Sequence, residues 1–274
     1  MNAKLCAVHT HSTLCDGKQP LAEMAAAAYD AGVKYYGVSC HSHTPVPHDE
    51  GNVLDADMAA YRAEVLRLRT EYADRMEVLL GLEWDALSDV SPEGFDYWIG
   101  SVHNLYDREQ NAYHAIDWDR EKLAACRDEM FGGDALAMVE GYFAEVARVA
   151  AMKPTILGHI DLITKLNGEG EFFDETHPRY RAAALAALHA ADPAATLLEI
   201  NTGAMARGYR AAPYPASFLL EEWRRMGGRV IITADVHHMD HMLYGYDQAA
   251  EAAKAAGFET GVLLTLNGPV EYPL

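Results

Sequence analysis

The stretch VHTHSTLCDG, residues 8–17, ends a short apolar run with two histidines one residue apart and an aspartate five residues after the second. Side chains at positions i and i+2 of a strand project to the same face, so His9 and His11 can reach one point in space. Two imidazoles beside the carboxylate of Asp16 suit a divalent metal such as zinc, iron or manganese. A solvated strand face explains an isolated His-x-His equally well, so the rest of the chain has to supply matching ligands.

The composition is that of a globular protein, with 50% hydrophobic and 23% charged residues among 274. We expect no membrane span and no signal peptide, because the chain has neither an 18-residue apolar run nor an uninterrupted apolar segment near its start. The four cysteines lack the spacing of a disulfide framework, which favours a cytoplasmic location. The formal net charge of −19 disfavours a nucleic-acid polymer as partner, whereas a small anionic substrate remains compatible if bound metal ions supply positive charge.

Strand-like apolar runs alternate with helical patterns along the whole chain. The strand-like runs are 4–11, 34–41, 76–84, 97–103, 155–160, 196–202, 229–235 and 261–267, and the helical patterns are 21–32, 54–75, 133–151, 178–191, 215–228 and 245–258. This order predicts an α/β fold, either a closed barrel or a doubly wound open sheet. No linker interrupts it, so we expect one domain over 1–274. Residues 104–133 form a long insertion after the fourth strand-like run, a place where loops often carry function.

Polar side chains stand where these strand-like runs end. They are His9 and His11, His41, Glu83, His103, His159, Asn201, and Asp235 with His237. In a barrel of alternating strands and helices the carboxyl ends of the strands meet on one face, where active sites are built. A common metal site explains this distribution better than several unrelated structural roles. The remaining histidines, among them His48 and His114, are expected at the surface.

Several longer motifs extend this pattern. GVSCHSHTP (37–45), GSVH (100–103), GHID (158–161) and DVH (235–237) accompany the initial HxH and Asp16. Together they resemble the PHP (polymerase and histidinol phosphatase) superfamily, in particular its histidinol-phosphatase branch. The resemblance implies a distorted TIM-like (β/α)7 barrel with a centre of three divalent metal ions, zinc, iron or manganese, at the C-terminal ends of the strands.

The resemblance also implies a ligand set for each ion. The first ion would take His9, His11, Glu83 and Asp235, the second Glu83, His103 and His159, and the third Asp16, His41 and His237. Glu83 would bridge the first two ions. CHSH offers both His41 and His43 for one ligand, and the distance from Gly32 favours His41.

The activity implied by the resemblance is hydrolysis of L-histidinol phosphate to L-histidinol and phosphate, in histidine biosynthesis. A metal-bound hydroxide would attack, without a covalent enzyme intermediate, at a site containing Glu83, Asp235 and His237 as catalytic residues. Arginine and lysine suit the binding of phosphate. The predicted substrate-binding residues are Arg207, Arg210, Lys165 and, beside His41, His43. Asp235, His237 or a metal-bound water could protonate the leaving group, and Asp161 and Asn201 could orient ligand histidines.

Three other functions remain compatible with parts of the pattern. One is a PHP phosphoesterase that acts on another small ester, a nucleotide or a sugar phosphate. Another is a non-catalytic metal-binding module, which the complete ligand set disfavours. The third is a metal-dependent amidohydrolase, which would carry a lysine or carboxylated bridge where this chain has Glu83 and GSVH.

Overall fold

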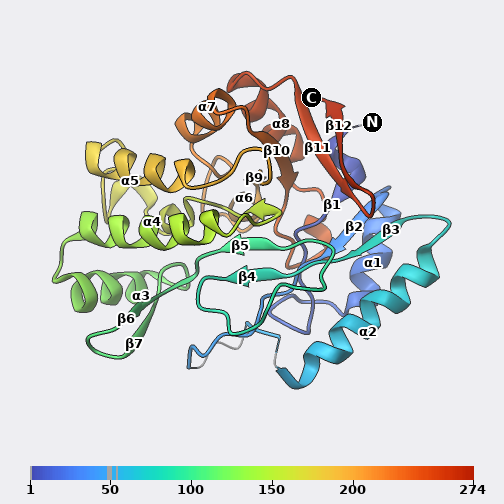
Figure 1. The fold of residues 1–274 in the computed structure, drawn as a ribbon, viewed down its shortest axis with the longest axis horizontal. Coiled ribbons are helices and arrows are strands. Elements are labelled where there is room, and N and C mark those ends of the chain that lie inside the picture. Colours follow the sequence, from blue (N-terminus) through green and yellow to red (C-terminus); the bar gives the residue numbers. More distant parts are fainter. Residues whose placement is uncertain (1, 48–50, 54) are drawn as a thin grey trace.

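The structure, a computed structural model, describes residues 2–47, 51–53 and 55–274, and strands alternate with helices along them (Figure 1). The strands are β1 (Cys6–Ala7), β2 (Tyr35–Val38), β3 (Glu77–Leu80), β4 (Glu83–Asp85), β5 (Ile99–Ser101), β6 (Asn104–Asp107), β7 (Ala112–Ala115), β8 (Ile156–Leu157), β9 (Leu197–Asn201), β10 (Arg229–Thr233), β11 (Thr260–Thr265) and β12 (Gly268–Pro273). The helices are α1 (Leu21–Asp30), α2 (Asp55–Tyr72), α3 (Arg120–Ala125), α4 (Ala135–Ala151), α5 (Pro178–His189), α6 (Gly203–Ala206), α7 (Ser217–Arg225) and α8 (Tyr246–Ala255). Each helical pattern in the sequence corresponds to one of the longer helices.

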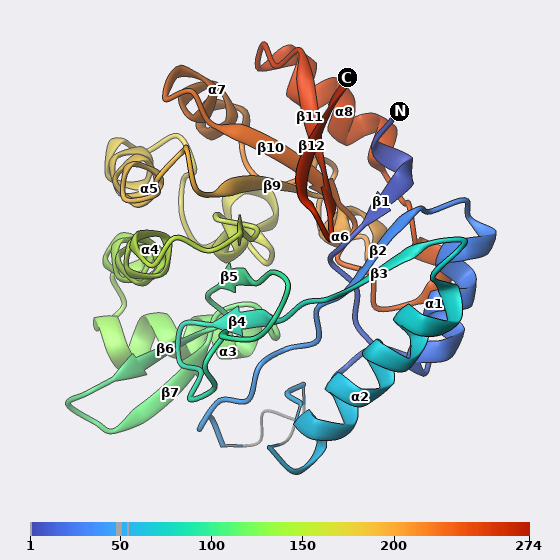
Figure 2. The ribbon, with the colours of Figure 1, turned by 45° about the vertical axis from the view of Figure 1, so that its right-hand side comes forward.

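Most of the strands belong to two parallel sheets, with the orders β1-β2-β3 and β10-β9-β8-β5-β4. Two isolated parallel bridges connect the sheets, one between Thr10 and Val236 and the other between His41 and Glu83. The longer helices lie around the outside of the strands (Figure 2). The expected α/β class is therefore confirmed, with parallel strands throughout these two sheets.

One predicted strand, 76–84, is in fact two strands with a break at Gly81 and Leu82. A Cβ atom at Gly81 would lie 2.2 Å from the Tyr97 ring, so a larger residue does not fit there. The Tyr97 hydroxyl donates a hydrogen bond of 2.5 Å to the carbonyl of Val8, which holds the ring in this place. After the break Glu83 begins β4 instead of ending a strand, and the expectation for its position within the strand is wrong.

Helix α4 illustrates how the outer layer is fixed to the sheet. Asp134 caps its start, because its carboxylate accepts hydrogen bonds from the backbone N–H groups of Leu136 (2.9 Å) and Ala137 (3.0 Å). The buried face of the helix comprises Met138, Val139, Tyr142, Phe143, Val146, Val149 and Ala150. At Gly100 in β5 a Cβ atom would lie 2.6 Å from Val149, so the glycine permits the close approach of α4 to the strand.

Two regions contain more structure than expected. The insertion 104–133 holds the antiparallel hairpin β6–β7 and helix α3, and the run 261–267 is part of a second antiparallel hairpin, β11–β12. Figure 2 shows the first hairpin and α3 on one side of the sheets, and both chain termini near the second hairpin. Among the described residues no helix combines the length and the apolar character needed to cross a membrane.

Candidate metal centre

The nine predicted metal ligands come together in one place; most of them follow the carboxyl end of a parallel strand, whereas Glu83 is the first residue of β4. Their side chains form four overlapping groups whose ligand atoms lie within 4.8 Å of one another. The groups are His11, Asp16, His41 and His237; His9, His11 and Asp235; His9, Glu83 and His159; and His41, Glu83 and His103. Residues more than 200 positions apart in the sequence thus share one site.

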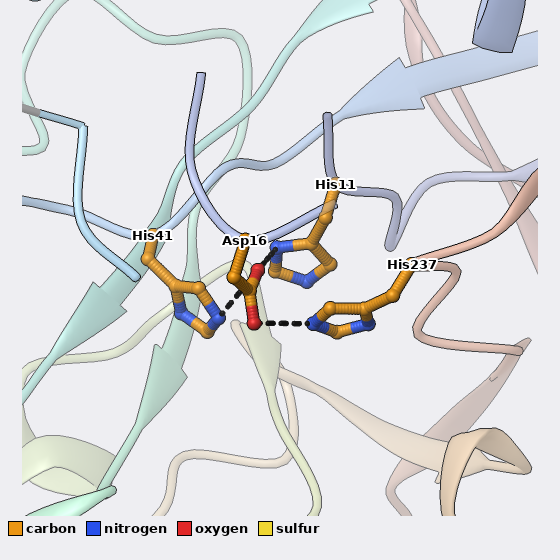
Figure 3. A group of neighbouring side chains, drawn as sticks. All are labelled: His11, Asp16, His41 and His237. Carbon is orange, nitrogen blue, oxygen red and sulfur yellow. Dashed lines mark ion pairs between the residues drawn. The ribbon is translucent and has the colours of Figure 1, made fainter. Parts of the chain in front are cut away.

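Asp16 is the centre of the first group (Figure 3). Its Oδ2 atom lies 3.0 Å from Nε2 of His237, and its Oδ1 atom lies 3.6 Å from both Nε2 of His41 and Nδ1 of His11. The imidazole rings of His11 and His237 are stacked, with their centroids 4.0 Å apart. Asp16 is brought here by the turn that follows His11, in which the backbone N–H groups of Cys15 and Gly17 both bond to the carbonyl of Ser12.

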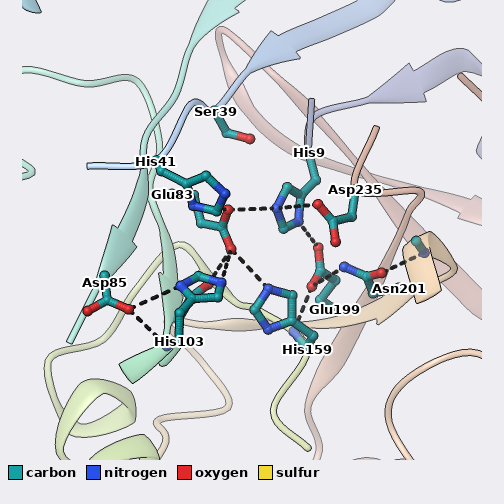
Figure 4. Close-up of polar contacts among 12 residues, drawn as sticks. His9, Ser39, His41, Glu83, Asp85, His103, His159, Glu199, Asn201 and Asp235 are labelled. Atoms are coloured by element: carbon teal, nitrogen blue, oxygen red, sulfur yellow. Dashed lines mark hydrogen bonds and ion pairs between the residues drawn. The ribbon is translucent and has the colours of Figure 1, made fainter. Parts of the chain in front are cut away.

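Glu83 is buried among histidines that surround both of its carboxylate oxygens (Figure 4). Oε2 lies 3.0 Å from Nδ1 of His41, 3.3 Å from Nε2 of His9 and 3.4 Å from Nε2 of His11. Oε1 lies 2.9 Å from Nε2 of His159 and 3.3 Å from Nε2 of His103. A carboxylate with different partners on its two oxygens is placed to bridge two cations.

Asp235 adds a second carboxylate to the pair formed by His9 and His11. Its Oδ1 atom lies 3.5 Å from Nε2 of His9 and 3.2 Å from Nε2 of His11. Its backbone has a φ of +47°, a conformation that costs energy for a residue with a side chain and that is common at functional sites. Gly203 leaves the necessary space, since a Cβ atom there would lie 2.7 Å from Cβ of Asp235.

Several buried polar atoms of this cluster have no hydrogen-bond partner among the described residues. They are Nε2 of His9, Nε2 of His11, Oδ1 of Asp16 and Oε2 of Glu83. Nδ1 of His9 is beside the carboxylate of Glu199, to which it donates, so Nε2 of the neutral imidazole carries a lone pair. A lone pair that faces carboxylate oxygens in a buried site needs a cation, either a proton or a metal ion, between them. These residues therefore fit divalent metal ions.

Charge pairing keeps negative charge at the centre of the cluster. Burial has the largest single effect on Glu83 and raises its pKa, but the imidazoles of His41 and His9 outweigh it and hold the pKa well below its usual range. Burial likewise raises the pKa of Asp235, and Arg207 and His9 lower it to well below its usual range. Both carboxylates are therefore ionised at neutral pH and attract cations.

A second layer of carboxylates orients the ligand imidazoles, and the sequence analysis missed its members. Nδ1 of His103 lies 3.0 Å from Oδ2 of Asp85, and Nδ1 of His9 lies 2.5 Å from Oε1 of Glu199. Such contacts fix which ring nitrogen faces a metal. One signal was available in the sequence: Glu199 is a charged residue inside the otherwise apolar run TLLEIN.

The two residues predicted to orient ligand histidines do not bond to them directly. Asn201 donates to Oε2 of Glu199 at 3.1 Å and so acts one step further out. Asp161 accepts from the backbone N–H of Ala216 at 2.8 Å. Of the two other histidines named above, His114 is buried on β7, contrary to the expectation of a surface position, and His48 lies outside the described residues.

A cavity of about 550 Å³ opens above the cluster. Two of the four predicted substrate-binding residues, Arg207 and Lys165, line it. Arg210 instead donates to the carbonyl of Thr164 at 2.9 Å, and Nδ1 of His43 lies 2.7 Å from Oδ1 of Asp89; neither side chain is part of the cavity lining. Of the two candidates in CHSH, it is His41 that joins the ligand cluster.

The chain is similar to known proteins over most of its length. Residues 7–203 match the family model of the PHP domain. Histidinol-phosphatase from Bacillus subtilis is 23% identical over 272 residues, which cover 89% of this chain and 97% of that protein. A protein named "Probable histidinol-phosphatase" from Deinococcus radiodurans is 29% identical over 278 residues, covering 93% and 95%. The crystal structure of histidinol phosphate phosphatase from Lactococcus lactis, in complex with zinc, L-histidinol and phosphate, superimposes with a TM-score of 0.72 at 18% identity and covers 97% of this chain and 99% of that one.

Proposed function

The chain belongs to the PHP domain family, and from this premise we propose that it is a metal-dependent phosphatase that hydrolyses L-histidinol phosphate to L-histidinol and phosphate. The observation that carries the proposal is the convergence of imidazole lone pairs and carboxylate oxygens around Glu83, at the base of a cavity that also contains Arg207 and Lys165. The names of the similar proteins supply the substrate.

We assign the nine ligands to three divalent ions of zinc, iron or manganese. His9, His11, Glu83 and Asp235 would hold the first ion, Glu83, His103 and His159 the second, and Asp16, His41 and His237 the third. The two oxygens of Glu83 face different sets of histidines, which supports its bridging role. Bound ions lower the pKa of water and offset the charge of the phosphoryl oxygens.

Arg207 is placed to bind the phosphate and to hold two of the proposed catalytic residues. Its Nη2 atom donates to Oδ2 of Asp235 at 2.9 Å, and its Nη1 atom lies 2.9 Å from Nδ1 of His237. Its side chain lines the cavity, where a guanidinium is suited to contact a phosphate oxygen. Arg207 thereby connects substrate binding to the orientation of Asp235.

Lys165 supplies a second positive charge to the cavity. Its Nζ atom lies 2.9 Å from Oδ2 of Asp117, and both side chains are largely buried, with exposed fractions of 13% and 19%. An ammonium group has three donors, so Lys165 can contact a phosphate oxygen while Asp117 holds it in place. The catalytic residues Glu83, Asp235 and His237 border the same cavity. Because the carboxylate of Asp235 is ionised, it is suited to accept a proton and not to supply one to the departing alcohol.

We further propose that the two sheets form a closed, distorted (β/α)7 barrel over a single domain, 1–274. The bridge between Thr10 and Val236 joins the segments that follow the edge strands β1 and β10. The bridge between His41 and Glu83 joins the segment after β2 to the edge strand β4 of the other sheet. Four free cysteines favour action in a reducing cytoplasm, and the net charge of −19 favours a small molecule over a nucleic-acid polymer as partner.

The test is phosphate release by protein loaded with manganese or zinc, measured with L-histidinol phosphate and with a panel of nucleotides and sugar phosphates. We expect kcat/KM for L-histidinol phosphate to exceed that for every other compound by about a hundredfold or more, on the order of the discrimination a substrate pocket can achieve. Turnover spread evenly over the panel would instead indicate a phosphoesterase with another small substrate. No turnover by metal-loaded protein would overturn the catalytic assignment.

A further inference from the structure

Two partly exposed aromatic side chains stand at the wall of the cavity. Trp118 is 61% exposed and Tyr209 is 47% exposed, and both line the cavity. The other large hydrophobic side chains with comparable exposure, among the described residues, lie elsewhere on the surface. Leaving such rings in water forgoes the stabilisation that burial provides, so their place beside an active site suggests a ligand that covers them.

The segment that carries Trp118 has a fixed position relative to the metal ligands. It follows β7 in the insertion 104–133, where the backbone N–H of Ile116 donates to the carbonyl of His103 at 3.0 Å. On its other side, Asp119 caps α3 by accepting from the backbone N–H of Lys122 at 2.7 Å. The neighbouring residue Asp117 pairs with Lys165 in the cavity. Trp118 is thus held between two anchored residues beside the proposed phosphate site.

Tyr209 is also close in the chain to a proposed phosphate-binding residue, Arg207. It lies two positions after Arg207, and its backbone N–H donates to the carbonyl of Ala204 at 2.9 Å. The Nζ atom of Lys165 lies 5.2 Å from the centroid of the Tyr209 ring. Asp117, the chain neighbour of Trp118, pairs with Lys165, and Lys165 lies beside Tyr209, so the four residues line one part of the cavity.

We propose that Trp118 and Tyr209 form a subsite for the organic part of the substrate and that Trp118 is a specificity residue that stacks on its imidazole ring. This inference rests on the proposed function. A phosphate held between Arg207, Lys165 and the metal cluster directs the rest of the ester toward the open part of the cavity, where the two rings lie. The imidazole is flat and titrates near neutral pH, so an indole face attracts both its neutral and its protonated form.

The experiment compares two substrates that differ only in the ring: L-histidinol phosphate and L-alaninol phosphate, in which a methyl group replaces the imidazolylmethyl group. We expect Trp118→Ala to lower kcat/KM for L-histidinol phosphate about tenfold, the size of a lost aromatic stacking contact, and to change that for L-alaninol phosphate less than about twofold. Trp118→Phe, which keeps an aromatic face, should retain most of the preference. Tyr244→Ala, at an exposed tyrosine outside the cavity lining, is the matched control and should leave both substrates unaffected.

A second readout does not depend on turnover. Calorimetric titration with L-histidinol should show a dissociation constant about tenfold higher for Trp118→Ala than for the wild type. An equal loss with both substrates, or no loss with either, would overturn the subsite. The wild-type rate with L-histidinol phosphate decides the proposed function by itself, so failure of one inference is distinguishable from failure of the other.

Discussion

Nδ1 of His9 lies 2.5 Å from Oε1 of Glu199, while Oε2 of the same carboxylate accepts a hydrogen bond from the backbone N–H of His159 at 2.7 Å. Thr233 and Asn201 donate to the same two oxygens, at 2.7 and 3.1 Å. One buried carboxylate thus holds two ligand-bearing segments and makes Nδ1 of His9 the protonated nitrogen. Each of the four groups that contact Glu199 donates a hydrogen bond. An ionised carboxylate, which only accepts, therefore satisfies all of them.

Glu199→Gln should therefore weaken metal binding although it removes no ligand. Glu199 accepts a hydrogen bond from each of its partners. The NH2 group of a glutamine would face one of these N–H or O–H donors, and the repulsion would disturb the orientation of His9. We expect about a 10- to 100-fold loss of metal affinity, measured by competition with a chelator. Glu140→Gln, which changes a surface ion pair with Arg179, is the matched control. Unchanged affinity in Glu199→Gln would contradict the orienting role.

Arg207→Lys should lower activity even though it preserves the positive charge. Lysine cannot contact Asp235 and His237 simultaneously in the forked geometry of a guanidinium. We expect kcat/KM for L-histidinol phosphate to fall by about 10- to 100-fold, corresponding to roughly 1.5–3 kcal/mol for hydrogen bonds to charged groups. Arg181→Lys, at a residue stacked on Phe218 away from the cavity, should retain full activity. Equal rates for the wild type and Arg207→Lys would remove Arg207 from the site.

Metal removal should destabilise the whole protein, because the buried carboxylates of Glu83 and Asp235 face the same imidazole nitrogens and lose the positive charge of the ions between them. Binding at about a thousandfold excess over Kd contributes about 4 kcal/mol. For a chain of this size that corresponds to a decrease in Tm of roughly 10 °C. Thermal unfolding before and after dialysis against a chelator measures it, and added zinc should restore the original Tm. A Tm that does not respond to the chelator would argue against a site in the protein core.

Gly81→Ala tests whether the packing of Tyr97 requires a glycine between β3 and β4. The added Cβ would overlap the Tyr97 ring, so we expect a loss of about 1–3 kcal/mol in the free energy of unfolding. At Gly168 a Cβ atom would meet no atom within 4 Å, so Gly168→Ala is the matched control and should change stability little. Denaturant unfolding of the metal-loaded protein measures both, and equal stability of the two variants would show that Tyr97 does not require glycine at 81.

The sequence predicted well those features that depend on short-range periodicity. The i, i+2 spacing of His9 and His11, and the polar residues after successive apolar runs, indicated the α/β class and the set of side chains that the structure brings together. The close approach of the Tyr97 ring to Gly81 was not foreseen, because the two residues are 16 positions apart in the sequence. The apolar run itself continues through the break without interruption.

The contacts that were missed are all made between distant segments. Glu199 and His9 are 190 residues apart, and no local pattern links them. Arg207 and Arg210 are both arginines in the same loop, so the sequence does not distinguish them. In the structure Arg207 lines the cavity, whereas Arg210 donates to the carbonyl of Thr164. His41 and His43 share one strand face by spacing, but the chain leaves β2 before them, and His43 pairs with Asp89. The insertion 104–133 lacked a clear pattern because its strands are short.

The most direct test of the metal centre is an anomalous difference map from crystals of zinc-loaded protein. The proposed assignment predicts three peaks, with the carboxylate of Glu83 between the first two and Asp16, His41 and His237 around the third. In Glu83→Gln the first two peaks should weaken together while the third persists. A map without peaks at these nine residues, or with all of its peaks elsewhere, would contradict the account.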